Sequence, residues 1–190
     1  SIGSHTTTAI AYDASSNTTS DTETFSVTLA DSAPSVNSPT TTPSTPNDTT
    51  SINFYTSASD DTSVTKIEFY VDGTSAGNLI HTCTFSPAGT PKTCSYDTTQ
   101  SVGSHTAYAK AYDGTGHVTT SSGANFSVLQ ALPTVSEVTH SPSSPDSSQA
   151  VTLSGTATSV YGISSIRIYL DGTNAGNLIK TCAYLSLIHI

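Results

Sequence analysis

The chain repeats itself with a period of about 100 residues, and this period constrains the fold more than any other feature of the sequence. The segment Ser1–Asp13 (SIGSHTTTAIAYD) matches Ser101–Asp113 (SVGSHTAYAKAYD) at 9 of 13 positions. The segment Thr65–Cys83 (TKIEFYVDGTSAGNLIHTC) matches Ser164–Cys182 (SSIRIYLDGTNAGNLIKTC) at 12 of 19 positions. A unit of this length is too long for a solenoid repeat and has the size of an independent domain.

The repeat predicts one complete domain between two partial ones. Residues 1–31 correspond to the end of one repeat, residues 32–131 to a complete repeat, and residues 132–184 to the beginning of a third. Residues 185–190 (LSLIHI) break the repeat and resemble a translated sequencing adapter, so we interpret them as a non-native tail; the alternative is an ordinary apolar strand. Because the chain starts with neither an initiator Met nor a signal peptide, we expect it to be an internal piece of a longer protein.

Alternating apolar and polar residues predict strands throughout the complete repeat. In Lys66–Val71 (KIEFYV), Ile67 and Phe69 are expected to face the core and Glu68 to face solvent. The third repeat supports this orientation, because it has Arg167 in place of Glu68, a charge reversal that suits a solvated side chain. Further strands are predicted at Ser51–Ala58, Asn78–Phe85, Lys92–Tyr96, His105–Tyr112 and His117–Val128.

Turn signals divide these strands at regular intervals. Asp72-Gly73 and Asp113–Gly116 (DGTG) supply residues that adopt positive φ at low cost, and the Thr-, Pro- and Ser-rich stretch Pro39–Thr50 is predicted to be a surface loop. Ala109 and Ala111 are expected to face inward, where small side chains allow two sheets to pack closely. About seven short strands per repeat favour an all-β fold, an immunoglobulin-like β-sandwich in tandem repeats.

The composition agrees with an all-β fold and excludes two function classes. Ser and Thr make up 68 of the 190 residues, and the β-branched and aromatic residues present suit strands. The net charge is −9 and the five basic residues form no cluster, so we exclude nucleic acid as a partner. No apolar run reaches the roughly 18 to 20 residues that a membrane span needs, so this segment is expected to make no membrane insertion.

Three motifs of the complete repeat resemble a known family. VTKIEFYVDG, CSYDTTQSVGSHTAYAKAYDGTG and the closing FSV are similar to the bacterial immunoglobulin-like repeats of secreted and cell-surface proteins. The resemblance covers Pro34–Val128 and the partial repeats, but Asp60–Ser63 (DDTS) stands where the family usually has an Asn-Val-Gly-like turn. The resemblance implies a stalk, spacer or adhesion module, or an accessory domain of a secreted enzyme, and it brings no catalytic motif.

We therefore expect a non-catalytic spacer, stalk or adhesion segment of a bacterial secreted or cell-surface protein, located outside the cell or at its surface. The expected partners are neighbouring Ig-like repeats, with a surface glycan or a host or cell-wall ligand as a further candidate. The alternative is an accessory carbohydrate-binding module of a secreted glycoside hydrolase. No enzyme is expected, because His105 and its counterpart His5 have no nucleophile or acidic partner at a matching position and are interpreted as polar residues at a strand start.

The three cysteines fit the repeat. Cys83 and Cys94 lie 11 positions apart within one repeat and predict a disulfide, which favours an oxidising compartment. A metal pair is the alternative, but no third and fourth ligands accompany these thiols. Cys182 is the counterpart of Cys83 in the third repeat and is expected to be unpaired and open to intermolecular pairing.

Acidic turns suggest one candidate metal site. Asp60 and Asp61 share a loop and Asp113 lies at another turn, and carboxylates are the ligands that Ca²⁺ prefers. The third repeat has Ser159 and Val160 in place of the first two, so such a site would not be general to the repeats. The alternative is that all three are ordinary turn residues. No other metal and no organic cofactor is expected.

Tyr108 is the candidate ligand contact among the tyrosines. Tyrosines that recur between repeats suit packing, whereas Tyr108 is replaced by Thr8 in the first repeat. It is therefore the better candidate for an exposed ring that stacks on a sugar, with packing as the alternative.

Overall fold

The computed structural model describes residues 1–136 and 138–183. In this part of the chain the regular elements are strands and two single-turn 3-10 helices, η1 (Ala76–Asn78) and η2 (Ala175–Asn177). The chain divides into two compact units. The first contains Ser1–Thr42, Asn53–Thr98 and His105–Phe126, and the second contains Pro43–Ile52, Thr99–Ser104 and the residues from Ser127 onward. The tail predicted at residues 185–190 lies outside the described residues.

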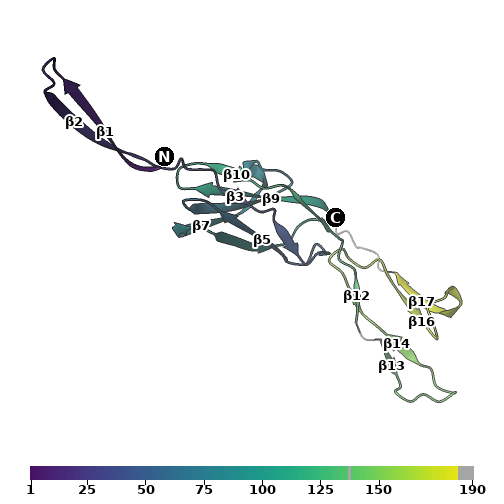
Figure 1. The fold of residues 1–190 in the computed structure, drawn as a ribbon. Helices are drawn as coiled ribbons and strands as arrows, with labels where there is room; N and C mark the ends of the chain where they lie inside the picture. The colour runs from purple at the N-terminus through teal and green to yellow at the C-terminus, as the bar shows by residue number, and fades with distance from the viewer. Residues whose placement is uncertain (137, 184–190) are drawn as a thin grey trace, which may run out of the picture. The chain divides into compact units, whose positions relative to one another are not determined.

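A hairpin begins the first unit. Strands β1 (Gly3–Tyr12) and β2 (Thr18–Val27) pair antiparallel, with Gly3 opposite Val27 and Tyr12 opposite Thr18 (Figure 1). The carboxylate of Asp13 holds the turn between them, because it accepts the backbone N–H groups of the two turn residues Ser15 and Asn17 at 2.8 Å each. Asp side chains commonly bond their own turns in this way.

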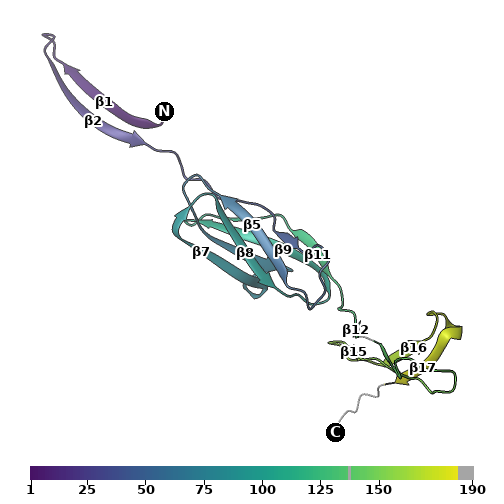
Figure 2. The same ribbon diagram turned by 90° about the horizontal axis from the view of Figure 1, so that it is seen from below.

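The complete repeat forms two sheets. One has the order β3-β5-β4, with β8 also paired with β5, and the other has the order β10-β9-β6-β7, with β11 also paired with β9 (Figure 2). This arrangement confirms the predicted all-β, immunoglobulin-like fold class. The bounds are β3 (Ser35–Val36), β4 (Thr40–Thr42), β5 (Ile52–Ser59), β6 (Val64–Val71), β7 (Leu79–Gly89), β8 (Lys92–Thr98), β9 (Gly103–Asp113), β10 (Val118–Thr120) and β11 (Ala124–Val128).

The core lies between these two sheets. Phe54 of β5 and Phe69 of β6 are 0% exposed, and their ring centroids are 6.2 Å apart. Phe126 of β11 meets Phe54 edge to face at 5.5 Å, a favoured aromatic geometry. The predicted inward side of Lys66–Val71 is confirmed, since Ile67 is fully buried like Phe69. The other buried apolar side chains are Ile52, Ala58, Val64, Tyr70, Val71, Cys94, Ala107, Ala109, Ala111 and Val128.

The predicted turn at Asp72-Gly73 is confirmed, and its counterpart one repeat later has the same geometry. Asp72 and Gly73 have φ of 61° and 146°, and Asp171 and Gly172, their counterparts one repeat later, have φ of 58° and 141°. Positive φ is the backbone region that Gly adopts freely and that Asp tolerates better than most residues. The local sequence therefore determines this turn independently of its surroundings.

The predicted strand His117–Val128 is wrong in its continuity, because it is divided into β10 and β11. Between them, the side-chain hydroxyl of Ser121 accepts the backbone N–H of Ala109 at 2.9 Å. Tyr108 lies over Gly123 so closely that a Cβ there would be 2.9 Å from the tyrosine Cε1 atom. A side-chain bond and a packed ring thus interrupt the ladder, and alternation along the sequence does not reveal either contact.

The predicted loop Pro39–Thr50 is also partly wrong, because its threonine-rich start forms β4. In the register with β5, Thr41 lies opposite Phe54. Threonine is β-branched and suits a strand whenever a partner edge is available. The rest of the stretch is loop, and Pro46 within it is fully buried.

The prediction that Glu68 faces solvent is wrong. Its residue is only 7% exposed, and its carboxylate accepts hydrogen bonds from the hydroxyls of Tyr70 and Tyr112 at 2.6 Å each. Lys66 Nζ donates to the same carboxylate at 2.7 Å and lies 3.7 Å from the ring centroid of Tyr112. Burial alone would raise the pKa of Glu68, but these donors outweigh it and hold the pKa below its usual range. The outer face of this sheet is therefore covered by its own long side chains.

The second unit contains three two-stranded pairs, which are β12–β15, β13–β14 and β16–β17. In the last pair Ile166 lies opposite Cys182. The division of the chain after residues 31, 131 and 184 stays a prediction, and the first two points lie between strands. The bounds are β12 (Thr134–Val135), β13 (Thr139–Ser141), β14 (Thr152–Ser154), β15 (Ala157–Thr158), β16 (Ser165–Tyr169) and β17 (Leu178–Ala183).

Candidate functional site

Asp113, the last residue of β9, organises the turn that leads to β10. Its side chain is 0% exposed, and Oδ1 accepts the backbone N–H groups of Thr115, Gly116 and His117 at 2.9, 2.7 and 2.8 Å. Gly116 has φ of 106°, which a side chain would disfavour. Burial opposes ionisation of Asp113, but the bonds from His117 and from the turn outweigh it and hold the pKa of this carboxyl below its usual range.

Asp31, between β2 and β3, reaches the same turn. Its Oδ1 accepts a hydrogen bond from the hydroxyl of Thr62 at 3.0 Å, and its Oδ2 accepts one from the hydroxyl of Thr115. The imidazole Nδ1 of His117 lies 3.1 Å from Asp31 Oδ2 and 2.8 Å from Asp113 Oδ2. The bond to Asp113, and then that to Asp31, raise the pKa of His117 above its usual value.

Asp60 and Asp61 lie in the loop between β5 and β6. Oδ2 of Asp60 accepts the backbone N–H groups of Thr62 and Ser63 at 3.1 and 2.8 Å. Oδ1 of Asp60 is shielded from solvent and has no hydrogen-bond partner among the described residues. One carboxylate oxygen from each of Asp31, Asp60 and Asp61 lies within 4.8 Å of the other two.

These four aspartates, Asp31, Asp60, Asp61 and Asp113, form an acidic cluster within the first unit. Of the three predicted residues, the structure brings Asp60 and Asp61 beside Asp31, whereas the carboxylate of Asp113 is bonded to its own turn and to His117. Sequence reasoning missed Asp31, because no motif marks an acidic residue just before a domain. Carboxylate oxygens at this separation suit a hard cation such as Ca²⁺.

The His117 contacts predict a pH-dependent contribution to stability. Because the folded-state pKa of His117 is raised, its ionised contacts stabilise the fold fully below the unfolded pKa of about 6.5 and are lost as pH rises through the folded pKa. We expect the melting temperature of the native chain to exceed that of His117→Gln by the largest margin near pH 5, and by a smaller margin near pH 9. Thermal melts of both proteins across this range check it, and a margin independent of pH would contradict it.

The expectation that His105 has no acidic partner is wrong. Its Nδ1 lies 2.8 Å from Asp72 Oδ2, and its ring packs on Phe126 with centroids 5.3 Å apart. Asp72 Oδ1 also accepts the backbone N–H of Thr106 at 2.9 Å. Burial alone would raise the pKa of Asp72, but these two hydrogen bonds outweigh that effect and hold the pKa below its usual range. The pair fastens the start of β9 to the turn after β6, in agreement with a polar residue at a strand start.

Tyr108 is half-buried on β9, opposite Tyr70 in the register with β6. Its ring covers Gly123, so part of its surface packs within the repeat. Its role as a ligand contact stays a prediction.

The predicted Cys83–Cys94 disulfide is present, with the Cα atoms 5.9 Å apart. Cys83 lies on β7, at the end of one sheet, and Cys94 lies on β8, which pairs with β5 of the other sheet. The disulfide therefore links the two sheets covalently. His81 of β7 stacks on Tyr96 of β8 with ring centroids 4.1 Å apart, which adds a second contact between these strands. Cys182 is a free thiol.

Comparison with known proteins agrees with this architecture. Residues 33–109, from just before β3 into β9, match the family model of the bacterial Ig domain. This part of the complete repeat is similar to a bacterial Ig domain. Modules of this class are typically non-catalytic and typically extracellular.

One similar solved structure is that of the Clostridium thermocellum CbhA fibronectin(III)-like modules, which is 19% identical with a TM-score of 0.41. The similarity covers 68% of this chain and 64% of that chain, which is less than two thirds of the latter's length. No curated protein sequence matches this chain. Among the described residues, no helix is both long enough and apolar enough to cross a membrane.

Proposed function

We propose that this chain is a spacer or stalk segment, or part of an adhesion segment, of a bacterial secreted or cell-surface protein. Neighbouring Ig-like domains in series would hold a functional domain away from the cell envelope. The observation that carries the proposal is that the connecting residues on both sides of the complete repeat are hydrogen-bonded to its loops. A connection tied in this way bends less than a free linker.

On the N-terminal side, Asp31 is the tied residue. Its carboxylate accepts hydrogen bonds from Thr62 and Thr115, which belong to two different loops of the sandwich. Pro34 follows three positions later and is fully buried. Proline fixes its own φ and restricts the residue before it, so little slack remains before β3.

On the C-terminal side, the loop between β4 and β5 ties the residues after β11. Leu129 N–H donates to the carbonyl of Pro46 at 3.0 Å, and Asp48 N–H donates to the carbonyl of Leu129 at 3.0 Å. Ala131 N–H then donates to Asp48 Oδ1 at 2.9 Å. Three successive bonds thus hold the chain where it leaves the complete repeat.

Single-molecule force spectroscopy tests the spacer function. Pulled between its ends, the complete repeat is expected to resist force and then unfold in one step, releasing about 3.5 Å per residue. Chemical reduction should lengthen this step, because the loop between Cys83 and Cys94 then also extends. Extension without a force peak would contradict a spacer that withstands tension. Glycan-array binding that Tyr108→Ala abolishes and Tyr55→Ala retains would instead support the carbohydrate-binding alternative.

Binding of Ca²⁺ at the acidic cluster is a second candidate function. The observation that favours it is the buried Oδ1 atom of Asp60, which has no hydrogen-bond donor and lies in a group of three converging carboxylates. A carboxylate oxygen without a donor is costly to bury, and a bound cation would compensate for that cost. Because Asp31 belongs to the connection before β3, the ion would also stiffen that joint.

Calcium binding predicts stabilisation that depends on Asp61. This side chain is exposed and its replacement leaves the hydrogen bonds of Asp60 in place. At a Ca²⁺ concentration ten times the Kd, the native chain should gain about 1.4 kcal/mol in free energy of unfolding, and Asp61→Asn should gain much less. Asp21→Asn, in the distant β1–β2 hairpin, is the matched control and should respond like the native chain. Melts with and without Ca²⁺ that coincide for the native chain would contradict the site.

A further inference from the structure

The β1–β2 hairpin has no sheet partner among the described residues. Its two strands pair only with each other, and most of their residues are exposed. Ile10 and Phe25 are each 52% exposed and Tyr12 is 71% exposed. A two-stranded hairpin is at best marginally stable alone in water, so this one gains from any sheet that accepts it.

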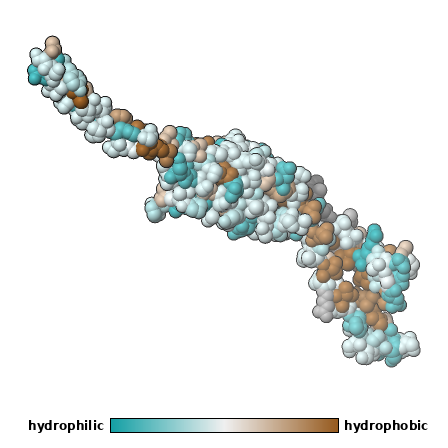
Figure 3. All heavy atoms as spheres, in the orientation of Figure 1, coloured by the Kyte–Doolittle hydropathy of each residue, from teal (hydrophilic) through white to brown (hydrophobic). Residues whose placement is uncertain are grey.

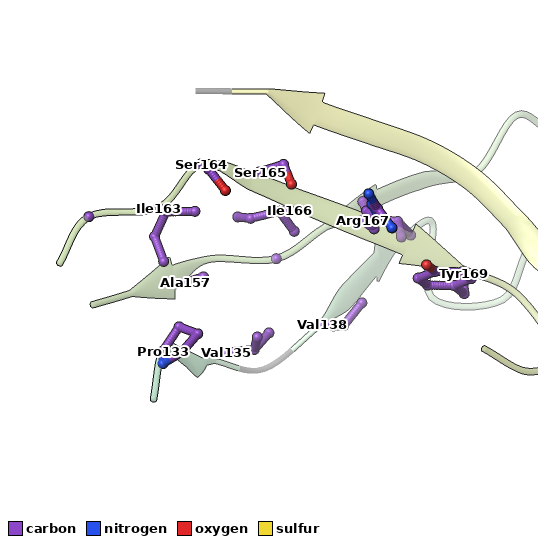
Figure 4. A pocket seen from close by; sticks show the side chains of 13 residues that line it. Pro133, Val135, Val138, Ala157, Ile163, Ser164, Ser165, Ile166, Arg167 and Tyr169 are labelled. Atoms are coloured by element: carbon purple, nitrogen blue, oxygen red, sulfur yellow. The ribbon is translucent and has the colours of Figure 1, made fainter. Parts of the chain in front are cut away.

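The second unit presents an apolar hollow of about 420 Å³ beside β16. Val135 and Ala157 line one side of it, and Ile163 and Ile166 line the other (Figure 4). Figure 3 shows hydrophobic residues gathered on the surface of this part of the chain. Apolar side chains that line an open hollow mark a surface suited to a partner.

The complete repeat shows what covers the equivalent surface. There β6, the counterpart of β16 one repeat earlier, pairs with β7 along one edge and with β9 along the other. In that register Ile67 lies opposite Ala111 and Phe69 lies opposite Ala109, and all four side chains are fully buried. Among the described residues, β16 pairs only with β17, the counterpart of β7.

The strand equivalent to β9 exists elsewhere in the chain, and it is β1. Ser1–Asp13 matches Ser101–Asp113 at 9 of 13 positions, including the inward alanines, Ala9 and Ala11. His5 packs on Phe25 at 5.4 Å in the hairpin, as His105 packs on its own phenylalanine at 5.3 Å in the complete repeat. The hairpin therefore already has the side-chain arrangement seen at the start of β9 and in β11 of the complete repeat.

We propose that the β1–β2 hairpin of a second copy of this chain adds to the edge of β16 and covers the hollow. Transfer of the β6–β9 register places Ile166 opposite Ala11 and Ile168 opposite Ala9 of the second copy. The new strand contributes main-chain hydrogen bonds along its length, and its small alanines allow the sheet to close over the apolar residues, as in strand addition generally.

The charges of the two surfaces are complementary. The hairpin and its turn carry three carboxylates, Asp13, Asp21 and Glu23, and no Lys or Arg. The β16–β17 pair carries Arg167 and Lys180, two of only five basic residues in the chain, with a single carboxylate, Asp171, in its turn. Opposite charge favours encounter of these two surfaces over encounter of two hairpins, which repel each other.

This interface is heterologous, because each molecule offers a hairpin at one place and an open edge at another. Association therefore propagates from molecule to molecule or closes into a ring. Sedimentation velocity or light scattering of the Cys182→Ser protein, which removes disulfide-linked dimers, should show a mass that rises with concentration from 19.5 kDa to multiples of it. A monomer mass at every concentration would overturn the proposal. The same result is expected if the hairpin pairs with β16 of its own chain, so that arrangement would also overturn it.

Two variants, each made in the Cys182→Ser protein, test the hairpin and the β16 edge separately. Ala9→Arg places a charge on the side of β1 that should face the hollow. Ile168→Asp places a charge on the same side of β16. Each variant alone should remain monomeric. Mixed in equal amounts, the two variants should form a dimer, because each keeps the surface that the other has lost. Dimer formation would also show that the hairpin of the Ile168→Asp protein and the β16 edge of the Ala9→Arg protein are folded. A mixture that stays monomeric would overturn the proposal.

Ile10→Glu is the matched control for the hairpin variant. Ile10 alternates with Ala9 and Ala11 and points to the opposite face of β1. In the register of β6 with β9, Lys110, the counterpart of Ile10, lies opposite Glu68. Arg167 replaces Glu68 in the third repeat, so the transferred register places residue 10 opposite Arg167, where a glutamate forms an opposite-charge pair. The Ile10→Glu protein should therefore associate at least as well as the parent. Loss of association equal to that of Ala9→Arg would show that the hairpin does not dock by this face.

Discussion

Phe54→Ala is expected to lower the free energy of unfolding of the complete repeat by about 3–5 kcal/mol. Phe54 is 0% exposed on β5 and contacts Phe69 and Phe126, which come from the opposite sheet. Its removal takes away buried apolar surface and leaves a cavity that stiff neighbouring strands fill only in part. Because a domain of this size is stable by only about 5–15 kcal/mol, this change removes a large fraction of its stability.

Urea unfolding followed by circular dichroism measures this loss. Tyr55→Ala is the matched control, because Tyr55 is the next residue of the same strand, points the other way and is 44% exposed. It should cost much less than Phe54→Ala. Equal losses for the two variants would show that the space between the sheets is not the main source of stability.

Removal of the Cys83–Cys94 disulfide, by replacing both cysteines with serine, is expected to cost about 3 kcal/mol. The disulfide joins residues 11 positions apart and so restricts the unfolded chain. It also connects strands from the two sheets, so its loss frees β7 and β8 to separate. The same variant should make stability insensitive to reducing agents.

Cys182→Ser is the control for the loss of a thiol alone. Cys182 is unpaired and lies on β17, so its replacement should leave the unfolding of the complete repeat unchanged in oxidising and in reducing buffer. If the native chain unfolded at the same urea concentration with and without reductant, the stabilising role of the disulfide would be contradicted.

The strands and turns of the complete repeat could largely be predicted from the sequence, because their causes are local. Alternation alone identified the inward side of Lys66–Val71, and the dipeptide Asp72-Gly73 identified its turn. The repeat supported these predictions, since each position could be compared with its counterpart. Glu68 was the exception: the same comparison suggested a solvated side chain, whereas Lys66 and Tyr70 of its own strand and Tyr112 of the neighbouring strand β9 cover it.

The candidate site was only partly predictable for the same reason. Asp60 and Asp61 were recognisable as acidic loop residues, but their approach to Asp31 depends on how a distant connection folds against the loop. The contact between His117 and Asp31 spans 86 positions, and that between His105 and Asp72 spans 33. Such contacts follow from strand order, which a single sequence does not state.

The sequence by itself predicted the fold class, the pairing of Cys83 with Cys94 and the correspondence between β1 and β9. These depend on periodicity and on residue type, which are properties of the chain before it folds. Only the tertiary structure decided that Asp31 joins the acidic cluster, that Glu68 is buried, and that the edge of β16 is open among the described residues. The reason is physical: burial and ion pairing depend on which strands become neighbours, and neighbours in a sandwich come from distant parts of the sequence.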